Sequence, residues 1–225
     1  MTCGVEYGSG TKSSETGSVP VLRMGNIQNG KFDWSDLVYT SDPEEIAKYA
    51  LRKGDVLFNR TNSPELVGKT AIYRGERPAV FAGYLIRVNH IPSLVDSDYL
   101  ALFLNSRLAR RFGGSVKTDG VNQSNINGVK LSNYPFPYCS IDEQREVVRL
   151  LEERLSIVER MEGDVEVGLL KAEALRQSIL KKAFSGRLVS QHSQDETASA
   201  LLKRVQSEPF DGESLIKKET KRKVA

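Results

Sequence analysis

Hydrophobic and polar positions follow two different rhythms along this chain, and the change lies near residue 140. Before it, short apolar runs stand between Gly, Pro, Asn and Asp, a pattern typical of strands bounded by turns. We predict strands at 19–22, 55–58, 70–73 and 84–88. Apolar residues at helical spacing predict helices at 42–49, with Asp42 as N-cap and Pro43 as first helical residue, and at 98–112. Residues 1–140 are therefore expected to form an α+β domain with an irregular mixed sheet.

Residues 141–186 lack proline, and their apolar positions recur at spacings of three and four. This heptad pattern predicts a long helix that forms a coiled coil. About 45 residues at 1.5 Å each give roughly 65 Å of helix, with Gly186 as its stop. Glu162 and Arg176 interrupt the apolar seam. The seam residues that we expect to mediate dimerisation are Val148, Leu151, Leu155, Val158, Val165, Leu169, Ala172 and Ile179.

Two shorter segments follow the long helix. Residues 187–206 hold one short helical pattern, at 196–205, and residues 207–225 are polar and basic, which favours a loose, solvated tail. A helix of about three turns is too short to cover the whole seam. The long helix therefore needs a partner, and we expect an antiparallel homodimer in which the same patch of each copy is buried.

The charge balance narrows the class of protein. The 225 residues have a net charge of +3, and residues 1–140 carry the excess, with 16 Lys and Arg against 13 Asp and Glu. This small excess suits a module that reads a short nucleic-acid stretch while partners supply the remaining affinity.

No apolar run reaches the roughly 18–20 residues of a membrane span, and a secretory signal pattern is missing at the start. With two cysteines and two histidines, we expect a reducing, cytoplasmic location and no metal site.

Motifs of enzymes give only weak signals. The sequence has no G-x-x-x-x-G-K-[ST] phosphate loop. We expect the glycine-rich stretch 4–10 to be a plain loop rather than a cofactor cradle. Asn133-Tyr134-Pro135-Phe136 resembles the N-P-P-[FYW] signature of adenine methyltransferases, but the second position is Tyr and no methyl-donor loop precedes it. We interpret it as structural and expect no catalytic residue in this chain.

Two polar runs carry the positive signal. One is 59–63, where Arg60 stands between Asn59 and Asn62, and the other is 117–125, rich in Lys, Asn, Gln and Ser. Asn and Gln can pair two-point with adenine, Arg can do so with guanine, and Lys, Ser and Thr commonly hold phosphates. The same residue types also favour ordinary turns, so composition leaves both interpretations open.

Several sequence blocks occur in a fixed order. VPVLRMGNIQNG (19–30), GDVLFNR (54–60) and ELVGKTA (65–71) come first, then NQSNI (122–126) and YPFP (134–137), followed by Glu143-Gln144, LRQSILKKAFSGRLV (175–189) and DETA (195–198). Together they resemble the target recognition domain and the spacer helix of a type I restriction-modification specificity subunit, over about residues 3–205.

The resemblance implies a non-catalytic DNA-recognition subunit. A full subunit of this family has two recognition domains, each reading one half of a split double-stranded DNA target, and two antiparallel spacer helices. It carries methylation subunits, which use S-adenosylmethionine to methylate a flipped adenine, and restriction subunits join them. This sequence has one domain and one helix, so it is either a natural half-subunit or a piece of a longer chain. In an antiparallel homodimer the target would be a split palindrome.

Resemblance and chemistry together give a set of expected DNA contacts. These are Lys12, Arg23, Asn26, Asn59, Arg60, Asn62, Lys69, Lys117, Thr118, Asn122, Gln123 and Asn125. Two other classes remain open from the residues. One is a coiled-coil adaptor whose globular domain binds protein rather than DNA, and the other is a lone adenine methyltransferase or nuclease. A salt-dependent affinity for DNA would distinguish the first interpretation from the adaptor.

Overall fold

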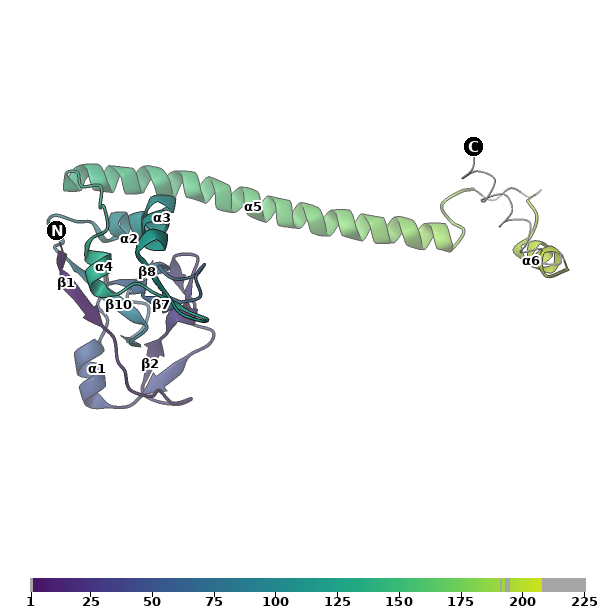
Figure 1. Cartoon of the computed structure of the whole chain (residues 1–225). Helices are drawn as coiled ribbons and strands as arrows, with labels where there is room; N and C mark the ends of the chain where they lie inside the picture. The colour runs from purple at the N-terminus through teal and green to yellow at the C-terminus, as the bar shows by residue number, and fades with distance from the viewer. Residues whose placement is uncertain (1, 191, 193–194, 208–225) are drawn as a thin grey trace, which may run out of the picture. The chain divides into compact units, whose positions relative to one another are not determined.

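The computed structural model describes residues 2–190, 192 and 195–207 (Figure 1), so the predicted basic tail lies outside the described residues from residue 208 on. The chain divides into two compact units, residues 1–158 and 159–225. Helix α5 (Ile141–Phe184) contributes residues 141–158 to the first unit and 159–184 to the second. Among the described residues, no helix has an apolar stretch that could cross a bilayer.

A four-stranded antiparallel sheet forms the centre of the first unit. Its strands are, in spatial order, β1 (Thr2–Tyr7), β10 (Leu85–His90), β6 (Val56–Asn59) and β8 (Thr70–Ile72). Successive side chains of a strand point to opposite faces. Val56 and Phe58 therefore enter one hydrophobic cluster, and Leu57 enters a second cluster with Phe81 and Leu85. Because both faces are covered, the first three residues of β6, Val56 to Phe58, form an unbroken apolar run.

Smaller sheets surround this centre. They comprise β5 (Val38–Thr40), β2 (Val19–Leu22) and β9 (Val80–Phe81), the hairpin β3 (Ile27–Gln28) and β4 (Lys31–Phe32), and β11 (Thr118–Asp119), β12 (Ser124–Asn125) and β7 (Thr61–Asn62). A short 3-10 helix, Met24–Asn26, precedes β3. β2 pairs antiparallel with β5 but parallel with β9. The predicted α+β class with an irregular mixed sheet is confirmed.

Local capping explains where the first helices begin. α1 (Pro43–Tyr49) starts as predicted, with the Asp42 carboxylate accepting from the Glu44 N–H at 2.9 Å. The predicted helix at 98–112 is interrupted at Ser106, which separates α2 (Ser97–Asn105) from α3 (Arg107–Val116). The Ser106 hydroxyl accepts from the Ala109 N–H at 3.2 Å. A residue that caps one helix cannot continue the helix before it, so two helices replace the single one expected.

The remaining helices are α4 (Gly128–Ser132), α5 and α6 (Ala198–Ser207). α5 ends where the sequence predicts. Gly186 has φ +67°, its N–H donates to the Ala183 carbonyl at 3.1 Å, and the Arg187 N–H donates to the Lys182 carbonyl at 2.8 Å. This pair of bonds is a Schellman motif, which glycine forms without strain. The predicted long helix and short C-terminal helix are both confirmed.

The prediction of a plain loop over residues 4–10 is wrong for its first part, because β1 extends through Tyr7. β1 lies against β10, with Val5 opposite Val88 and Tyr7 opposite Ile86. The partner strand is about 80 residues away in the sequence, so no local pattern could have revealed the pairing. Gly8 follows, and a Cβ there would lie 2.4 Å from the Phe81 carbonyl oxygen, so only glycine fits this close approach.

Candidate nucleic-acid interface

The two polar runs of the sequence meet in one small antiparallel sheet, β11-β12-β7, which we call the polar ribbon (residues 61–62 and 118–125). Ser124 lies opposite Asn62, and Asn125 lies opposite Thr61. The Asn125 amide donates to the Thr61 hydroxyl at 2.7 Å, and the Ile126 N–H donates to the Arg60 carbonyl at 2.8 Å. Segments some 60 residues apart in the sequence therefore present their polar side chains together.

The β11–β12 hairpin is braced by its own charged and hydroxyl groups. The Lys117 ammonium lies 3.1 Å from an Asp119 carboxylate oxygen and 3.4 Å from the Ser124 hydroxyl, which also donates to Asp119. The Ser124 hydroxyl, and then Lys117, hold the pKa of the Asp119 carboxyl below its ordinary 3.8. The Lys130 ammonium donates to the Thr118 hydroxyl at 2.5 Å. These contacts fix the base of the hairpin and occupy Lys117, whose predicted phosphate contact stays a prediction.

The tip of the hairpin is the exposed part of the polar ribbon. A four-residue loop connects the strands and is closed by the Gly120 N–H, which donates to the Gln123 carbonyl at 2.7 Å. The side chains of Val121, Asn122 and Gln123 are exposed, Val121 completely. A rigid base with an exposed tip bearing two amides is suited to insertion into a groove of a ligand.

Arg60 lies beside the polar ribbon and is held by two contacts that the sequence did not reveal. Its guanidinium carbon lies 4.9 Å from the centroid of the Tyr7 ring, and Nη1 donates to the Gly83 carbonyl at 3.2 Å. Tyr7 is in turn fixed because its hydroxyl accepts from the Gly128 N–H at 2.8 Å. Stacking on an aromatic ring orients the flat guanidinium while its outer edge can still bind a ligand. Tyr84 is half exposed, and its carbonyl accepts from the Arg60 N–H at 3.0 Å.

Asn59 does not fit the predicted DNA contact. Its side chain is completely buried, and neither amide atom has a partner among the described residues. The reason is its place at the end of β6, where its N–H donates to the Lys69 carbonyl at 2.8 Å and its carbonyl accepts from the Gly68 N–H. Direct readout needs a side chain that reaches the surface. The buried Asn59 amide therefore cannot contact DNA in this arrangement.

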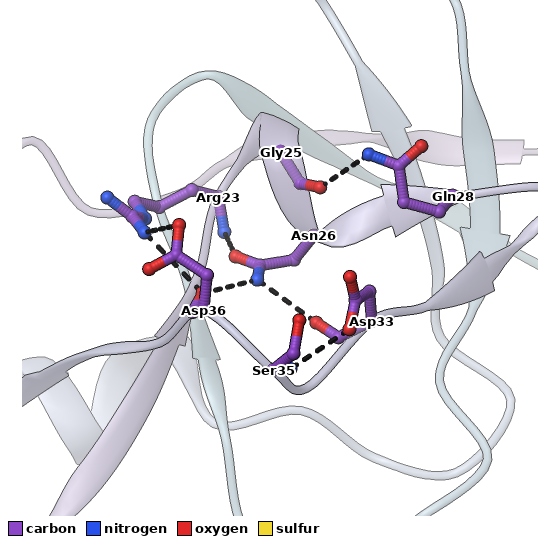
Figure 2. Close-up of polar contacts among 7 residues, drawn as sticks. All are labelled: Arg23, Gly25, Asn26, Gln28, Asp33, Ser35 and Asp36. Carbon is purple, nitrogen blue, oxygen red and sulfur yellow. Dashed lines mark hydrogen bonds and ion pairs between the residues drawn. The ribbon is translucent and has the colours of Figure 1, made fainter.

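Asn26 is also buried, and its side chain forms hydrogen bonds with backbone groups of its own loop (Figure 2). Its amide oxygen accepts from the Arg23 N–H at 2.8 Å, and its amide nitrogen donates to the carbonyls of Asp33 and Asp36 at 3.0 and 2.8 Å. The Arg23 guanidinium forms an ion pair with the Asp36 carboxylate at 3.1 Å. Both predicted contacts therefore tie residues 23–36 together, and the buried Asn26 amide cannot reach DNA in this arrangement.

The other predicted contacts are accessible to different degrees. Lys69 is half-buried, and its ammonium donates to the Gln28 side-chain oxygen at 3.2 Å. Lys12 and Thr118 are exposed, and Asn62 is half-buried, with its side-chain oxygen accepting from the Ser63 N–H at 2.8 Å. The structure thus brings seven of the predicted residues together in or next to the polar ribbon: Arg60, Asn62, Lys117, Thr118, Asn122, Gln123 and Asn125.

The Asn133–Phe136 segment packs into the core. The Tyr134 ring lies 5.0 Å from that of Phe112 and 6.1 Å from that of Phe58, and burial raises the pKa of Tyr134 to about 12. Phe136 makes edge contacts with Tyr99 and Phe103. The rings of Tyr134, Phe136 and Phe103 line a cavity of about 360 Å³ together with aliphatic side chains that include those of β10 and α2. The structural interpretation of this motif agrees with these contacts.

The seam of α5 is exposed beyond its first turns. Val148 is half-buried, whereas Leu151, Leu155, Val158, Val165, Leu169, Ala172 and Ile179 are all exposed, Leu169 by 71%. Glu152, Glu159, Glu166 and Glu173 follow at intervals of seven along one flank of the seam, and we call them the glutamate row. An apolar seam flanked by charge is the usual arrangement of a coiled-coil helix.

Comparison with known proteins places these features in a family. The family model described as "Type I restriction modification DNA specificity domain" matches residues 8–162. The putative type I restriction enzyme MjaX specificity subunit of Methanocaldococcus jannaschii is 31% identical over 74% of this chain and 39% of its own length. The EcoKI specificity subunit of Escherichia coli strain K12 is 29% identical over 89% of this chain and 46% of its own length. This chain thus spans less than half the length of these relatives.

Two solved structures share the fold. A chain from a study of complex assembly and conformational transition of the type I R-M system matches with a TM-score of 0.64 and 20% identity, over 82% of this chain and 44% of that chain. The HsdS subunit of Thermoanaerobacter tengcongensis gives a TM-score of 0.53 at 20% identity, over 83% and 43%. With the family model matching more than half of its residues, this chain belongs to the type I restriction modification DNA specificity domain family.

Proposed function

We propose that this chain is a DNA specificity subunit with one recognition domain, which reads one half of a split double-stranded DNA target. The observation that carries the proposal is the polar ribbon, where two distant polar runs form one three-stranded sheet and the braced β11–β12 hairpin of that sheet has an exposed tip. The major groove of B-DNA, about 12 Å wide, admits a two-stranded β-ribbon. The two-stranded β11–β12 hairpin of the polar ribbon has the shape and the side chains for that groove.

The chemistry of readout follows from the side chains at the surface. Asn122 and Gln123 at the tip can each pair two-point with an adenine edge, and the stacked Arg60 can do so with guanine. Lys12 and Thr118 are exposed, as phosphate contacts require. Bracing before binding matters because a preordered loop loses less conformational entropy when it meets DNA.

The catalytic steps lie on other subunits in this proposal. A methylation subunit would hold S-adenosylmethionine and the flipped adenine, and a restriction subunit would join the same complex. This chain would itself be non-catalytic and would act in the cytoplasm, where the DNA is.

We further propose that α5 pairs antiparallel with a second copy of the chain through its seam. Charge along the helix favours this orientation, because Asp and Glu outnumber Lys and Arg in residues 141–162, whereas the reverse holds in 163–184. The glutamate row opposes it, since in an antiparallel pair each flank meets the same flank of its partner, and like charges repel. Added salt screens this repulsion between the glutamate rows.

DNA binding by the purified chain tests the proposal. Binding should weaken steeply with salt, and a target found by selection from random duplexes should bind more tightly than the pool. Asn122→Ala with Gln123→Ala should remove this preference, while Gln177→Ala, an exposed Gln on α5, should keep it. Self-association without any DNA affinity would instead support the coiled-coil adaptor.

A further inference from the structure

A set of three arginines on α3 stands apart from the residues considered so far. Arg107, Arg110 and Arg111 lie at positions i, i+3 and i+4, which share one side of a helix. All three are exposed, and within the described part of the chain none of them forms an ion pair. We call them the arginine face.

The opposite side of α3 fixes this face in place. Ala109 and Gly113 are buried, and the Phe112 ring packs against Tyr134. A Cβ on Gly113 would lie 2.5 Å from the Tyr134 hydroxyl, so glycine allows the helix to approach this closely. The three guanidinium groups therefore project from a rigid support, and long exposed cations without a carboxylate partner are suited to an anionic ligand.

A single residue, Lys117, joins α3 to the polar ribbon. α3 ends at Val116, the Lys117 N–H donates to the Gly113 carbonyl at 2.8 Å, and β11 begins at Thr118. Arg111 therefore lies about 14 Å along the chain from the start of the ribbon, at 1.5 Å per helical and about 3.3 Å per extended residue. This is of the same order as the roughly 12 Å width of the major groove, which separates the two strands at its edges.

We propose that the arginine face binds phosphates of the DNA strand beside the groove that the polar ribbon reads. The inference rests on the proposed DNA recognition and adds the surface that grips the backbone. Arg107 and Arg111 are about 6 Å apart along the helix axis, and each DNA strand carries one phosphate per 3.4 Å of axis. The face therefore meets about two phosphates, and arginine can hold a phosphate through two parallel hydrogen bonds.

The test is a salt titration of duplex binding with the triple variant Arg107→Gln, Arg110→Gln, Arg111→Gln, using a random-sequence duplex as the probe. Each phosphate contact contributes about 0.9 to the slope of log affinity against log salt. We expect the slope to fall by about 1.8, which corresponds to roughly 60-fold weaker binding at 0.1 M salt. The single variant Arg107→Gln should lower the slope by about 0.9, because Arg107 lies at one end of the face.

A matched control separates the effect of the arginine face from the effect of removing three positive charges elsewhere on the domain. Lys48→Gln, Arg52→Gln, Lys53→Gln removes the same charge from α1 and the turn after it, and its slope should stay close to that of the unmodified chain. The preference for the target over random DNA should survive in the arginine variants, because phosphate contacts carry no sequence information. Three results would overturn the inference while DNA recognition stands. The triple variant could keep the slope of the unmodified chain, or the control could lose as much slope as the triple variant. The arginine variants could also lose the preference for the target with no change in slope. Absence of DNA binding by the unmodified chain would overturn both.

Discussion

Replacing Gln144 should loosen the junction between α5 and the recognition domain. Its side chain is completely buried in the first turn of α5. The amide oxygen accepts from the Asp96 N–H at 3.0 Å, and the amide nitrogen donates to the carbonyls of Leu94 and Cys139, both at 2.9 Å. One side chain thus satisfies three backbone groups, one of them at Asp96, the N-cap of α2.

The magnitude follows from those three bonds. Gln144→Leu keeps a similar volume but leaves one N–H and two carbonyls without this partner, and each unsatisfied buried group costs about 1–3 kcal/mol. The leucine gains some apolar burial, so we expect the free energy of unfolding to fall by about 3–5 kcal/mol. This is a large share of the roughly 5–15 kcal/mol typical of a domain.

Urea denaturation followed by tryptophan fluorescence measures this loss. Trp34, the single tryptophan, lies in the first unit and packs against its core, so the signal reports on the recognition domain rather than on α5. Gln177→Leu is the control, because Gln177 is exposed and, among the described residues, its side chain donates only to the Glu173 carboxylate, and it should cost less than about 0.5 kcal/mol. A loss below about 1 kcal/mol for Gln144→Leu would refute the assigned role of these hydrogen bonds.

Three further predictions concern binding, assembly and pH. Arg60→Ala should weaken binding to the selected target by about 1–3 kcal/mol, as measured by fluorescence anisotropy, and an unchanged affinity in the folded variant would exclude a base contact. Leu155→Asp with Leu169→Asp should dissociate the homodimer in sedimentation experiments; a chain that is monomeric at micromolar concentration before mutation, with α5 folded, contradicts self-pairing. NMR titration should place the pKa of Asp119 below 3.8, and Ser124→Ala should raise it. Because the folded pKa is depressed, the contribution of Asp119 to hairpin stability is present above the unfolded pKa and is lost as the pH falls through the folded value.

The sequence predicts most of the helical structure because helix signals are local. Asp42 and Pro43 mark the start of α1, and Gly186 marks the end of α5, through contacts within a few residues. The turn Asn29-Gly30 is an equally local signal for the β3–β4 hairpin, with φ +50° and +76°, and could have been predicted.

The strands and the burial of polar residues depend on distant partners. β1 is stabilised by β10, and Asn59 is covered by segments that only the folded chain brings over it. The two polar runs are visible in the sequence, but their union in one ribbon depends on the pairing of β7 with β12. Sequence reasoning therefore finds the residue types of the candidate site and misses which of them reach the surface.

DNA methylation in cells that express this chain is the most direct test of the proposed DNA recognition. Cells that express it with a methylation subunit should acquire methyladenine at one discrete motif, which is a split palindrome if α5 pairs two copies. Asn122→Ala with Gln123→Ala should erase or alter that motif while the chain remains folded and assembled. A methylome with no new motif, or the same motif with the variant, would contradict DNA recognition through the polar ribbon.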